Sequence, residues 1–356
     1  MYLGQLSSDK VPNGCGKMTY PNDDVYEGGL LDGHPSGQGK MVYAAGSKLT
    51  SFPTGYRCHN CASFEGSWLR GIFCQQGKLL WADGSVYVGD FKDGVKNGHG
   101  KFTWSSGGVY EGDFKDDKLN GRGKCIYASG EVYDGGWLDD ILNGRGKYTW
   151  PSGTEYEGDF KDGKKDGRGK QKFADGVVYD GGWKQGVRTG RGKMIYASGE
   201  VYDGDWKDDK LNGRGKFTWP NGGDYEGDFK DGKKDGRGKM IYGNGDVYDG
   251  GWLDNKYNGR GKFTWPNGGD YEGDFKNDKK DGRGKMIYAT GGGYDGDWKD
   301  DKYHGRGKQI SANGVVYDGD WNDNKMHGKG KITCADGKVF EGNFKNDKFD
   351  SACLIS

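Results

Sequence analysis

The chain has 356 residues, of which 53 are Lys or Arg and 53 are Asp or Glu, so its formal net charge at pH 7 is zero. This balance excludes a strong net field towards nucleic acid and restricts any anion-binding surface to a local stripe. Only 32% of the residues are hydrophobic and 72 are Gly, a composition that alone would suggest disorder. The aromatic residues nevertheless recur at fixed intervals, which a disordered chain has no reason to do.

A unit of 23 residues recurs along almost the whole chain. It opens with an aromatic-x-Gly triplet, and from Phe64 to Phe340 the opening ring returns every 23 residues without a slip. Two earlier copies open at Tyr2 and Tyr26, and residues 49–63 form an insertion between the second and third copies. Such a period predicts a solenoid or array, here a single repeat domain of about fifteen copies over residues 1–356.

Each unit is predicted to be a β-hairpin. In the copy that opens at Tyr202, rings and glycines alternate with charged residues on both sides of a polar, turn-prone segment, residues 208–213. We therefore expect an all-β fold, an elongated single-layer ribbon of tandem antiparallel hairpins. The ring and glycine framework of this copy comprises Tyr202, Gly204, Trp206, Gly213, Gly215, Trp219 and Gly222.

The alternation also suggests a register within the hairpin. If Tyr202 lies opposite Trp219, the next rings along both strands lie opposite glycines, which avoids clashes between rings. On the other face Asp205 would then lie opposite Lys216. All rings would share one side of the ribbon, and the charges would share the other.

The link between units, residues 219–222, has the sequence Trp-Pro-Asn-Gly. A two-residue Asn-Gly turn is rejected, because it would move the ring of Tyr225 to the charged face. A type I turn followed by a bulge sets Phe217 opposite Tyr225 and needs a positive φ at Gly222.

The arrangement Tyr-x-Gly-x-Trp/Phe, then Gly-x-Gly-x-x-x-Tyr/Trp-x-x-Gly, resembles the MORN (membrane occupation and recognition nexus) repeat. One copy reads Tyr248, Gly250, Trp252, Gly259, Gly261, Trp265 and Gly268. The resemblance covers the chain apart from residues 49–63, and among the departures is Gln75 at the place of a loop glycine.

The resemblance implies a non-enzymatic, rod-like scaffold that self-associates, as a homodimer, and organises protein partners where membrane and cytoskeleton meet. It implies two alternatives: a peripheral membrane protein that binds anionic phospholipid headgroups, or a regulatory or targeting subunit of a separate enzyme. The start of the sequence lacks a signal peptide, no run approaches 18 apolar residues, and the seven cysteines are irregularly placed, all of which favour a cytoplasmic protein.

One face of the expected ribbon carries a line of basic residues, which we call the basic ladder. An Arg recurs at one position in nine successive units, two residues before a Lys. The candidates for contact with lipid or an acidic partner are Arg168, Arg191, Arg214, Arg237 and Arg260, with the loop residues Lys233 and Lys234 beside them. The alternative is a solvated face on which the arginines pair with a line of aspartates, Asp113, Asp159, Asp205, Asp228 and Asp274.

Cysteines suggest two further sites. The last four residues match the C-a-a-X pattern, so Cys353 is a candidate for prenylation, unless the segment is only a truncated final strand. Cys58 and Cys61 have the C-x-x-C spacing of a zinc site, with Cys74 in the adjacent hairpin; the alternative is a loop with free thiols. No other cofactor is expected.

Overall fold

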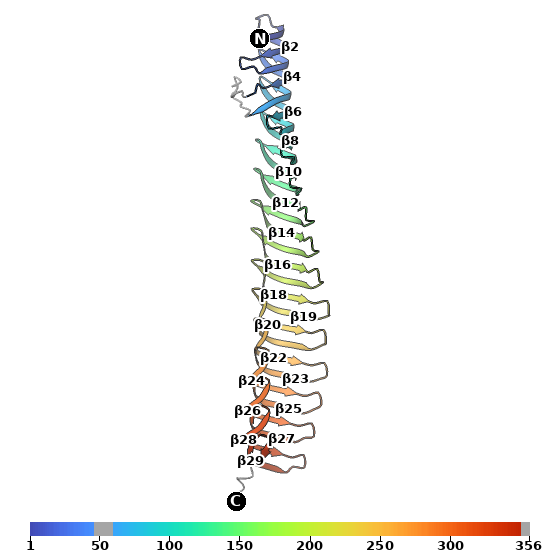
Figure 1. Ribbon diagram of the computed structural model, residues 1–356, viewed down its shortest axis with the longest axis vertical. Helices are drawn as coiled ribbons and strands as arrows, with labels where there is room; N and C mark the ends of the chain where they lie inside the picture. Colours follow the sequence, from blue (N-terminus) through green and yellow to red (C-terminus); the bar gives the residue numbers. More distant parts are fainter. Residues whose placement is uncertain (46–59, 350–356) are drawn as a thin grey trace. The chain divides into compact units, whose positions relative to one another are not determined.

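The computed structural model describes residues 1–45 and 60–349. This part of the chain contains thirty β-strands and no helix, so nothing in it forms a helix that could cross a bilayer (Figure 1). The contacts divide the chain into two units, Met1–Ala174 with Trp183–Gly186 and Asp175–Gly182 with Val187–Ser356. The predicted sites at Cys58 and Cys353 lie outside the described residues.

The strands follow the period of the sequence. The first unit contains β1 (Tyr2–Leu6), β2 (Pro12–Thr19), β3 (Val25–Leu31), β4 (His34–Val42), β5 (Cys61–Leu69), β6 (Ile72–Trp81), β7 (Val86–Lys92), β8 (Val95–Thr103), β9 (Val109–Lys115), β10 (Lys118–Ile126), β11 (Val132–Leu138), β12 (Ile141–Thr149), β13 (Glu155–Lys161) and β14 (Lys164–Lys172). β15 (Val178–Lys184) has residues in both units. The second unit contains β16 (Val187–Ile195), β17 (Val201–Lys207), β18 (Lys210–Thr218), β19 (Asp224–Lys230), β20 (Lys233–Ile241), β21 (Val247–Leu253), β22 (Lys256–Thr264), β23 (Asp270–Lys276), β24 (Lys279–Ile287), β25 (Gly293–Lys299), β26 (Lys302–Ile310), β27 (Val316–Asn322), β28 (Lys325–Thr333), β29 (Val339–Lys345) and β30 (Lys348–Phe349).

Within each unit the strands pair antiparallel with their neighbours in sequence, as a single layer of hairpins. β17 pairs with β18 inside one hairpin, and β18 pairs with β19 of the next. β4 pairs directly with β5, with Met41 opposite Phe64, although residues 46–59 lie between them in the sequence. The predicted fold class, an all-β ribbon of tandem antiparallel hairpins, is confirmed.

The register inside the hairpin differs from the predicted one by two residues. Tyr202 lies opposite Phe217, and Gly204 lies opposite Gly215, so the predicted pairing of Tyr202 with Trp219 is wrong. The rings still cover glycines. The Tyr202 ring lies over Gly204, two residues further along its own strand, and over Gly215, which is opposite Gly204. A Cβ at Gly204 or Gly215 would come closer than 3.0 Å to the ring of Tyr202.

The hairpin turn explains the difference in register. Only Asp208 and Asp209 form the turn, and both have positive φ, 48° and 64°, as in a type I′ turn. Residues 210–213, predicted to be loop, belong to β18. A bulge sets the single residue Asp205 against residues 212–214, and this bulge takes up the residues that the shorter turn leaves over.

The charged pair predicted inside the hairpin is also wrong. Lys216 lies opposite Asp203 rather than Asp205. The Asp205 carboxylate instead accepts a hydrogen bond of 3.1 Å from the backbone N–H of Arg214 in the bulge. Charges of opposite sign still share the exposed face, but the bulge decides which of them meet.

The link between hairpins has the predicted geometry. The Gly222 N–H donates to the Trp219 carbonyl at 3.1 Å, φ at Gly222 is 86°, and Phe217 lies opposite Tyr225. The parity argument is therefore confirmed. Gln75 has a φ of 56°, so this residue adopts the left-handed conformation that glycine has at the equivalent positions.

Buried rings join each hairpin to its neighbours. The Tyr202 side chain has no exposed surface, and its hydroxyl donates to the Asp205 carbonyl at 2.9 Å. The indole N–H of Trp206 donates to the carbonyl of Gly192 in the preceding hairpin at 3.0 Å. The Tyr202 ring meets the ring of Phe229 in the following hairpin edge to face, with 5.3 Å between centroids. No hairpin buries its rings alone, which is why the fold needs consecutive copies.

Candidate functional site

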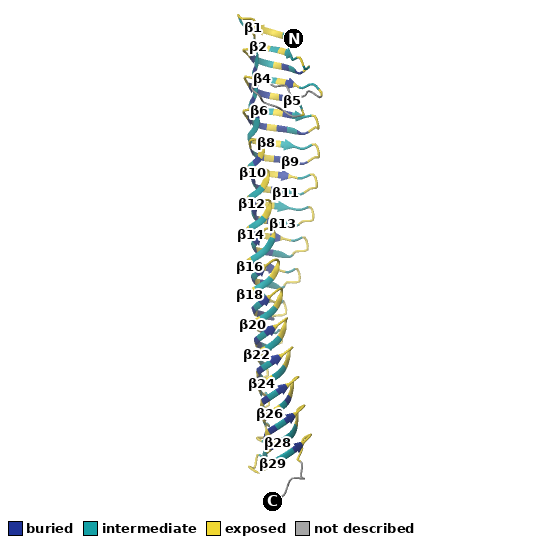
Figure 2. Ribbon diagram, turned by 90° about the vertical axis from the view of Figure 1, so that its left-hand side faces the viewer, coloured by how far each residue is buried: buried dark blue, intermediate teal, exposed yellow. Residues whose placement is uncertain are grey.

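Each hairpin has a ring face and a charged face. In β17 the buried residues Tyr202, Gly204 and Trp206 alternate with less buried ones, and the same burial pattern recurs in the odd-numbered strands from β7 to β27 (Figure 2). Since the ring face is committed to packing, the charged face is the surface that a partner or ligand meets.

Most arginines of the basic ladder face carboxylates. Arg191 lies opposite Asp205, Arg214 opposite Asp228, and Arg260 opposite Asp274. The aspartate line of the alternative interpretation therefore does lie beside the ladder.

Several of these arginines also make ion pairs along the face. The Arg191 guanidinium is 3.4 Å from the carboxylate of Asp203, and that of Arg260 is 3.4 Å from Glu272. The four side chains are more than half exposed, so each pair contributes only about 0–1 kcal/mol to stability. The pairs nevertheless neutralise much of the ladder.

Glycine interrupts this pairing in certain hairpins. In the hairpin that opens at Tyr202, the residue before the second ring, Trp206, is Asp205. We call a hairpin with Asp at this position an aspartate hairpin. The residue at this position is a glycine in the hairpins that open at Tyr26, Tyr133, Tyr179 and Tyr248, which we call glycine hairpins: Gly29, Gly136, Gly182 and Gly251. Arg122 lies opposite Gly136, and Arg237 lies opposite Gly251, so neither has the cross-strand carboxylate that Arg214 has.

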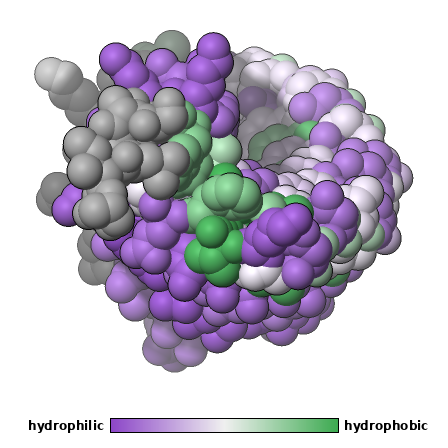
Figure 3. Space-filling view, turned by 90° about the horizontal axis from the view of Figure 1, so that it is seen from below, coloured by the Kyte–Doolittle hydropathy of each residue, from purple (hydrophilic) through white to green (hydrophobic). Residues whose placement is uncertain are grey.

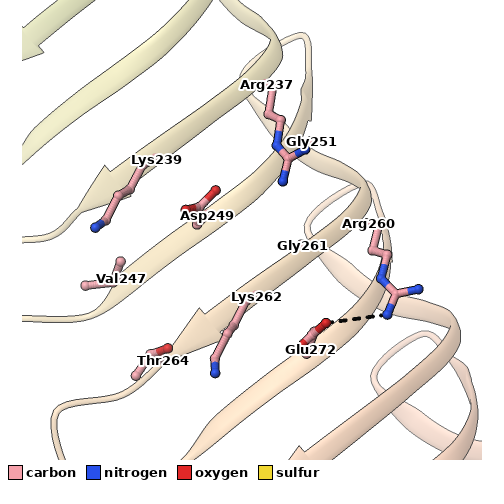
Figure 4. Close-up of a pocket in the computed structure, with 10 residues that line it drawn as sticks. All are labelled: Arg237, Lys239, Val247, Asp249, Gly251, Arg260, Gly261, Lys262, Thr264 and Glu272. Atoms are coloured by element: carbon pink, nitrogen blue, oxygen red, sulfur yellow. Dashed lines mark hydrogen bonds and ion pairs between the residues drawn. The ribbon is translucent and has the colours of Figure 1, made fainter.

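The glycine hairpins that open at Tyr133 and Tyr248 each line a hollow on the charged face, and we call these the Gly136 hollow and the Gly251 hollow. The Gly251 hollow has a volume of about 590 Å³ (Figure 4). Its charged lining is Arg237, Lys239, Arg260, Lys262, Asp249 and Glu272. The Gly136 hollow, of about 560 Å³, is lined by the equivalent residues Arg122, Lys124, Arg145, Lys147, Asp134 and Glu157. Four cations and two carboxylates leave an excess of two positive charges in each.

An aspartate hairpin gives the comparison. The hollow of about 400 Å³ next to Asp274 also has four cations, Arg260, Lys262, Arg283 and Lys285. It has four carboxylates as well, Asp270, Glu272, Asp274 and Asp295, and so carries no excess charge. The charge excess is therefore found in the Gly136 and Gly251 hollows and is not a property of the ladder as a whole.

The loop lysines do not extend the ladder as predicted. Lys233 pairs with Asp254 at 2.9 Å on the exposed side. Lys234 lies on the ring face, where its Nζ is 4.2 Å from the ring centroid of Trp252, and partial burial lowers its pKa. Its placement beside the ladder was wrong. The signal was present in the sequence, because Leu211 and Tyr257 occupy the same position in neighbouring hairpins.

The remaining ladder candidate, Arg168, lies in β14, where its backbone N–H donates to the Asp159 carboxylate at 3.1 Å. This is the bond that Arg214 makes with Asp205 in the second unit. In both units, therefore, the backbone N–H of a ladder arginine donates a hydrogen bond to the carboxylate of the aspartate at the bulge.

The zinc site stays a prediction, because Cys58 lies outside the described residues. Cys61 is disulfide-bonded, a state in which its sulfur does not coordinate zinc. Cys74 is a partly buried free thiol opposite Ser67, and burial raises its pKa. Within residues 1–45 and 60–349, no three His, Cys, Asp or Glu side chains gather as metal ligands.

Comparison with known families gives one match. The model of the MORN repeat matches fourteen blocks: residues 7–25, 26–48 and then each block of 23 residues from 64–86 to 317–339. The first block starts inside the first predicted copy, and no block covers the copy predicted to open at Phe340.

Among curated proteins, Alsin of Rattus norvegicus is 31% identical over 103 residues, and Alsin of Homo sapiens is 30% identical over 103 residues. Both matches cover 28% of this chain and 5% of the relative, so the chain spans only a small part of the length of these relatives.

Among solved structures, the SAS-4 TCP domain of Drosophila melanogaster in complex with a proline-rich motif of Ana2 aligns with a TM-score of 0.27 and 12% identity. That alignment covers 48% of this chain and 86% of the other. The TCP10 domain of Danio rerio CPAP in complex with a STIL peptide aligns with a TM-score of 0.24 and 11% identity, over 77% and 97% of the two chains. Scores this low support no inference about function.

Proposed function

Because the chain belongs to the MORN repeat family, we propose that it is a non-enzymatic scaffold that binds copies of itself and organises protein partners where a membrane and the cytoskeleton meet in the cytoplasm. MORN repeats imply a repeat scaffold with a membrane-associated interaction role. The self-association, the partners and the location are the proposed part.

The observation that carries the proposal is the repetition of the charged face itself. In the described strands from β7 to β27, exposed side chains of the same kinds return at the same positions in most hairpins. A surface that repeats at a fixed period offers many equivalent contacts, and linked contacts bind far more tightly than one alone. Such a surface suits the ordering of partners better than the conversion of a substrate.

The ring face of β29 supports self-association. Phe340 is 49% exposed and Val339 is 50% exposed, whereas the equivalent ring Tyr225 is fully buried. From the C-terminal end, the second unit shows a small hydrophobic area among hydrophilic residues (Figure 3). An exposed ring face is suited to packing against a second copy.

The test measures the mass of the purified protein in solution by light scattering. We expect the wild type at twice the 39.1 kDa of the chain and Phe340→Asp at the mass of one chain. Leu253→Asp is the matched control, because Leu253 is 48% exposed but lies in an interior hairpin. A monomeric wild type, or a dimer that survives Phe340→Asp, contradicts self-association through this face.

The two alternatives are less well supported. Lipid binding by the whole ladder conflicts with the carboxylates that face Arg191, Arg214 and Arg260. A role as the regulatory subunit of a separate enzyme requires a catalytic subunit that co-purifies in fixed ratio, which affinity purification from the native source would reveal.

A further inference from the structure

We propose that a hollow on the ring face beside Leu119 binds the ammonium group of a lysine side chain from a partner protein. This hollow, which we call the Leu119 hollow, is formed in the first unit by residues of β8 to β11 and of the turns next to them (Figure 1). The packing of the ring face is incomplete at this place. The inference rests on the proposed scaffold function, because it gives the chemistry of one partner, but it involves neither the charged face nor self-association.

The chain itself holds lysine side chains among rings at equivalent positions. The Nζ of Lys234 lies 4.2 Å from the ring centroid of Trp252, and 5.3 and 5.7 Å from those of Tyr225 and Trp219. Each ring face at such a distance attracts an ammonium group. We call these three rings a cage: the Trp of the preceding link, the Tyr that opens the hairpin and the second ring of the following hairpin.

The same arrangement recurs with other lysines. The Nζ of Lys165 lies 4.6 Å from the ring centroid of Trp183, and that of Lys280 lies 4.7 Å from the ring centroid of Trp298. Of the five tryptophans at links between hairpins, four are followed by such a lysine fifteen residues later, in the pairs Trp81 and Lys96, Trp150 and Lys165, Trp219 and Lys234, and Trp265 and Lys280. A Trp at the link is therefore associated with an ammonium group in the cage.

The fifth link tryptophan, Trp104, lacks its lysine. The residue at the equivalent position is Leu119, although its cage has the same ring types as that of Lys234, namely Trp104, Tyr110 and Trp137. Trp104 and Trp137 line the hollow, which has a volume of about 400 Å³. A leucine ends at its Cδ atoms, so nothing in its side chain corresponds to the Cε and Nζ of a lysine. The cage therefore has the rings for an ammonium group that the chain does not supply.

A second short side chain enlarges the hollow. Cys125 lines it and is 1% exposed. The equivalent residues Gln171 and Met240 have longer side chains, and the Gln171 side-chain oxygen accepts a hydrogen bond of 2.5 Å from the Nζ of Lys165. Leu119 and Cys125 together therefore account for the open space in this cage.

The charges of the lining favour a cation. Asp117 and Asp140 line the hollow together with a single cation, Lys96, which leaves an excess of one negative charge. The Asp140 carboxylate accepts the backbone N–H of Leu119 at 2.7 Å, and the Asp117 carboxylate accepts that of Lys96 at 2.9 Å. A carboxylate accepts more than one hydrogen bond, so both can also bind an ammonium group. Burial lowers the pKa of Lys96 and these two carboxylates raise it, which shows that both lie near the cage.

A lysine side chain fits this combination better than other side chains. The ring faces and the carboxylates both attract its ammonium group, and its four-carbon stem can lie along the rings. An apolar group would gain from the rings alone, and an acidic group would be repelled by Asp117 and Asp140. Trp104 and Tyr127 in the lining are partly exposed, so a partner can reach the hollow from solvent.

The test is two-dimensional NMR of the full chain during titration with n-butylammonium, which has the stem and charge of a lysine side chain. We expect the indole N–H signals of Trp104 and Trp137 to shift, and Trp104→Phe and Trp137→Phe assign them. The neutral analogue 1-butanol should bind at least about threefold more weakly, because it lacks the attraction of the rings and carboxylates for a cation. Equal affinity for the alcohol would overturn the proposal.

Two variants fill the hollow with residues that the same framework carries in other hairpins. Leu119→Lys supplies the ammonium group from the chain itself, as Lys234 does, and should abolish the binding of n-butylammonium. Cys125→Met introduces the side chain of Met240 and should weaken the binding at least about threefold. The matched control is Leu211→Lys, in a hairpin of the second unit, which should leave the titration unchanged. Binding that survives Leu119→Lys, or that Leu211→Lys also abolishes, would contradict the proposal.

A third variant tests the charge. Asp140→Asn removes a carboxylate but keeps an acceptor for the backbone, as Asn255 shows at the equivalent position, where it accepts the N–H of Lys234 at 2.8 Å. We expect the affinity for n-butylammonium to fall about three- to tenfold. Asp301→Asn makes the same change beside Lys280 and should have no effect on the Leu119 hollow. Equal effects of the two substitutions would rule out Asp140 as a binding group.

Peptides test whether a lysine within a polypeptide reaches the hollow. Acetyl-Gly-Lys-Gly-amide should shift the same two indole signals and lose this effect in Leu119→Lys, whereas the peptide with norleucine in place of lysine should bind at least about threefold more weakly. Binding of n-butylammonium without binding of the lysine peptide would overturn the assignment to a partner protein. Leu119→Lys should keep the mass of the wild type in light scattering, so the failure of this inference and the failure of self-association are distinguishable.

Discussion

Gly215→Ala tests whether a tyrosine that covers two glycines stabilises the hairpin. The new methyl group would lie closer than 3.0 Å to the ring and hydroxyl of Tyr202. That ring has no exposed surface and cannot shift aside, because Trp206 and Phe229 meet it edge to face with centroids 5.4 and 5.3 Å away. We therefore expect Tyr202 to leave its position.

The cost follows from what the ring loses. Burial of an aromatic side chain contributes about 1.5–3 kcal/mol, and the hydrogen bond from the Tyr202 hydroxyl to the Asp205 carbonyl contributes about 0.5–1.5 kcal/mol. The expected loss is about 2–4 kcal/mol for this hairpin. Repeat arrays do not unfold as one unit, so the measurement is hydrogen exchange resolved by peptide. Amides of β17 and β18 should exchange about thirty- to several-hundred-fold faster.

Two comparisons can refute this reasoning. Gly222→Ala places a methyl group where nothing lies within 4 Å, and so it costs only the left-handed backbone at φ 86°, about 1–2 kcal/mol. A larger effect of Gly222→Ala than of Gly215→Ala would show that the clash with Tyr202 is unimportant. In the double variant, Tyr202→Ala should add little to Gly215→Ala, because the ring is already displaced; full additivity of the two changes would contradict that account.

Further predictions concern charge and titration. Burial raises the pKa of Tyr133 and Tyr179 to about 12 from the ordinary tyrosine value of 10.0. Unfolded tyrosines ionise first, so stability should be complete below pH 10 and fall as the pH rises towards 12, with circular dichroism showing loss of structure before or together with tyrosinate absorbance. Lys234→Leu reproduces the residue at Leu211, and we expect it to change the free energy of unfolding by less than about 1 kcal/mol in hydrogen exchange. Lys234→Glu sets a negative charge against the face of Trp252 and should destabilise β20 by about 1–3 kcal/mol.

The sequence was sufficient for the strands and for the link between hairpins. Period-two alternation separates the ring face from the charged face, and parity alone selects the three-residue loop that sets Phe217 opposite Tyr225. The register predicted within the hairpin is wrong because it treats residues 208–213 as one loop, whereas residues 210–213 belong to β18. The next copy has Asp231-Gly232 at the turn position, a typical type I′ pair, and that signal predicts a two-residue turn.

The charged face could be predicted only in part. The positions of the arginines follow directly from the period, but their neighbours depend on a bulge in which one residue faces three. Without the bulge, Asp205 is assigned to Lys216, and the contact between Asp205 and the Arg214 amide is missed. The importance of Gly251 is hidden for the same reason, since its effect depends on Arg237 lying opposite.

The differences between copies are therefore more informative about binding than the features that all copies share. The rings and glycines bury the same contacts in successive hairpins, so an exposed residue can change in one copy without loss of the fold, and the stability of the array is close to a sum of local terms. Asp205 and Gly251 occupy the same position on the same framework, yet one closes the charged face and the other opens a hollow with two excess positive charges. The converse change, Asp205→Gly, should therefore remove the carboxylate that accepts the backbone N–H of Arg214, and we expect this amide to exchange about ten-fold faster. An unchanged exchange rate of the Arg214 amide in that variant would show that the Asp205 carboxylate does not stabilise the bulge.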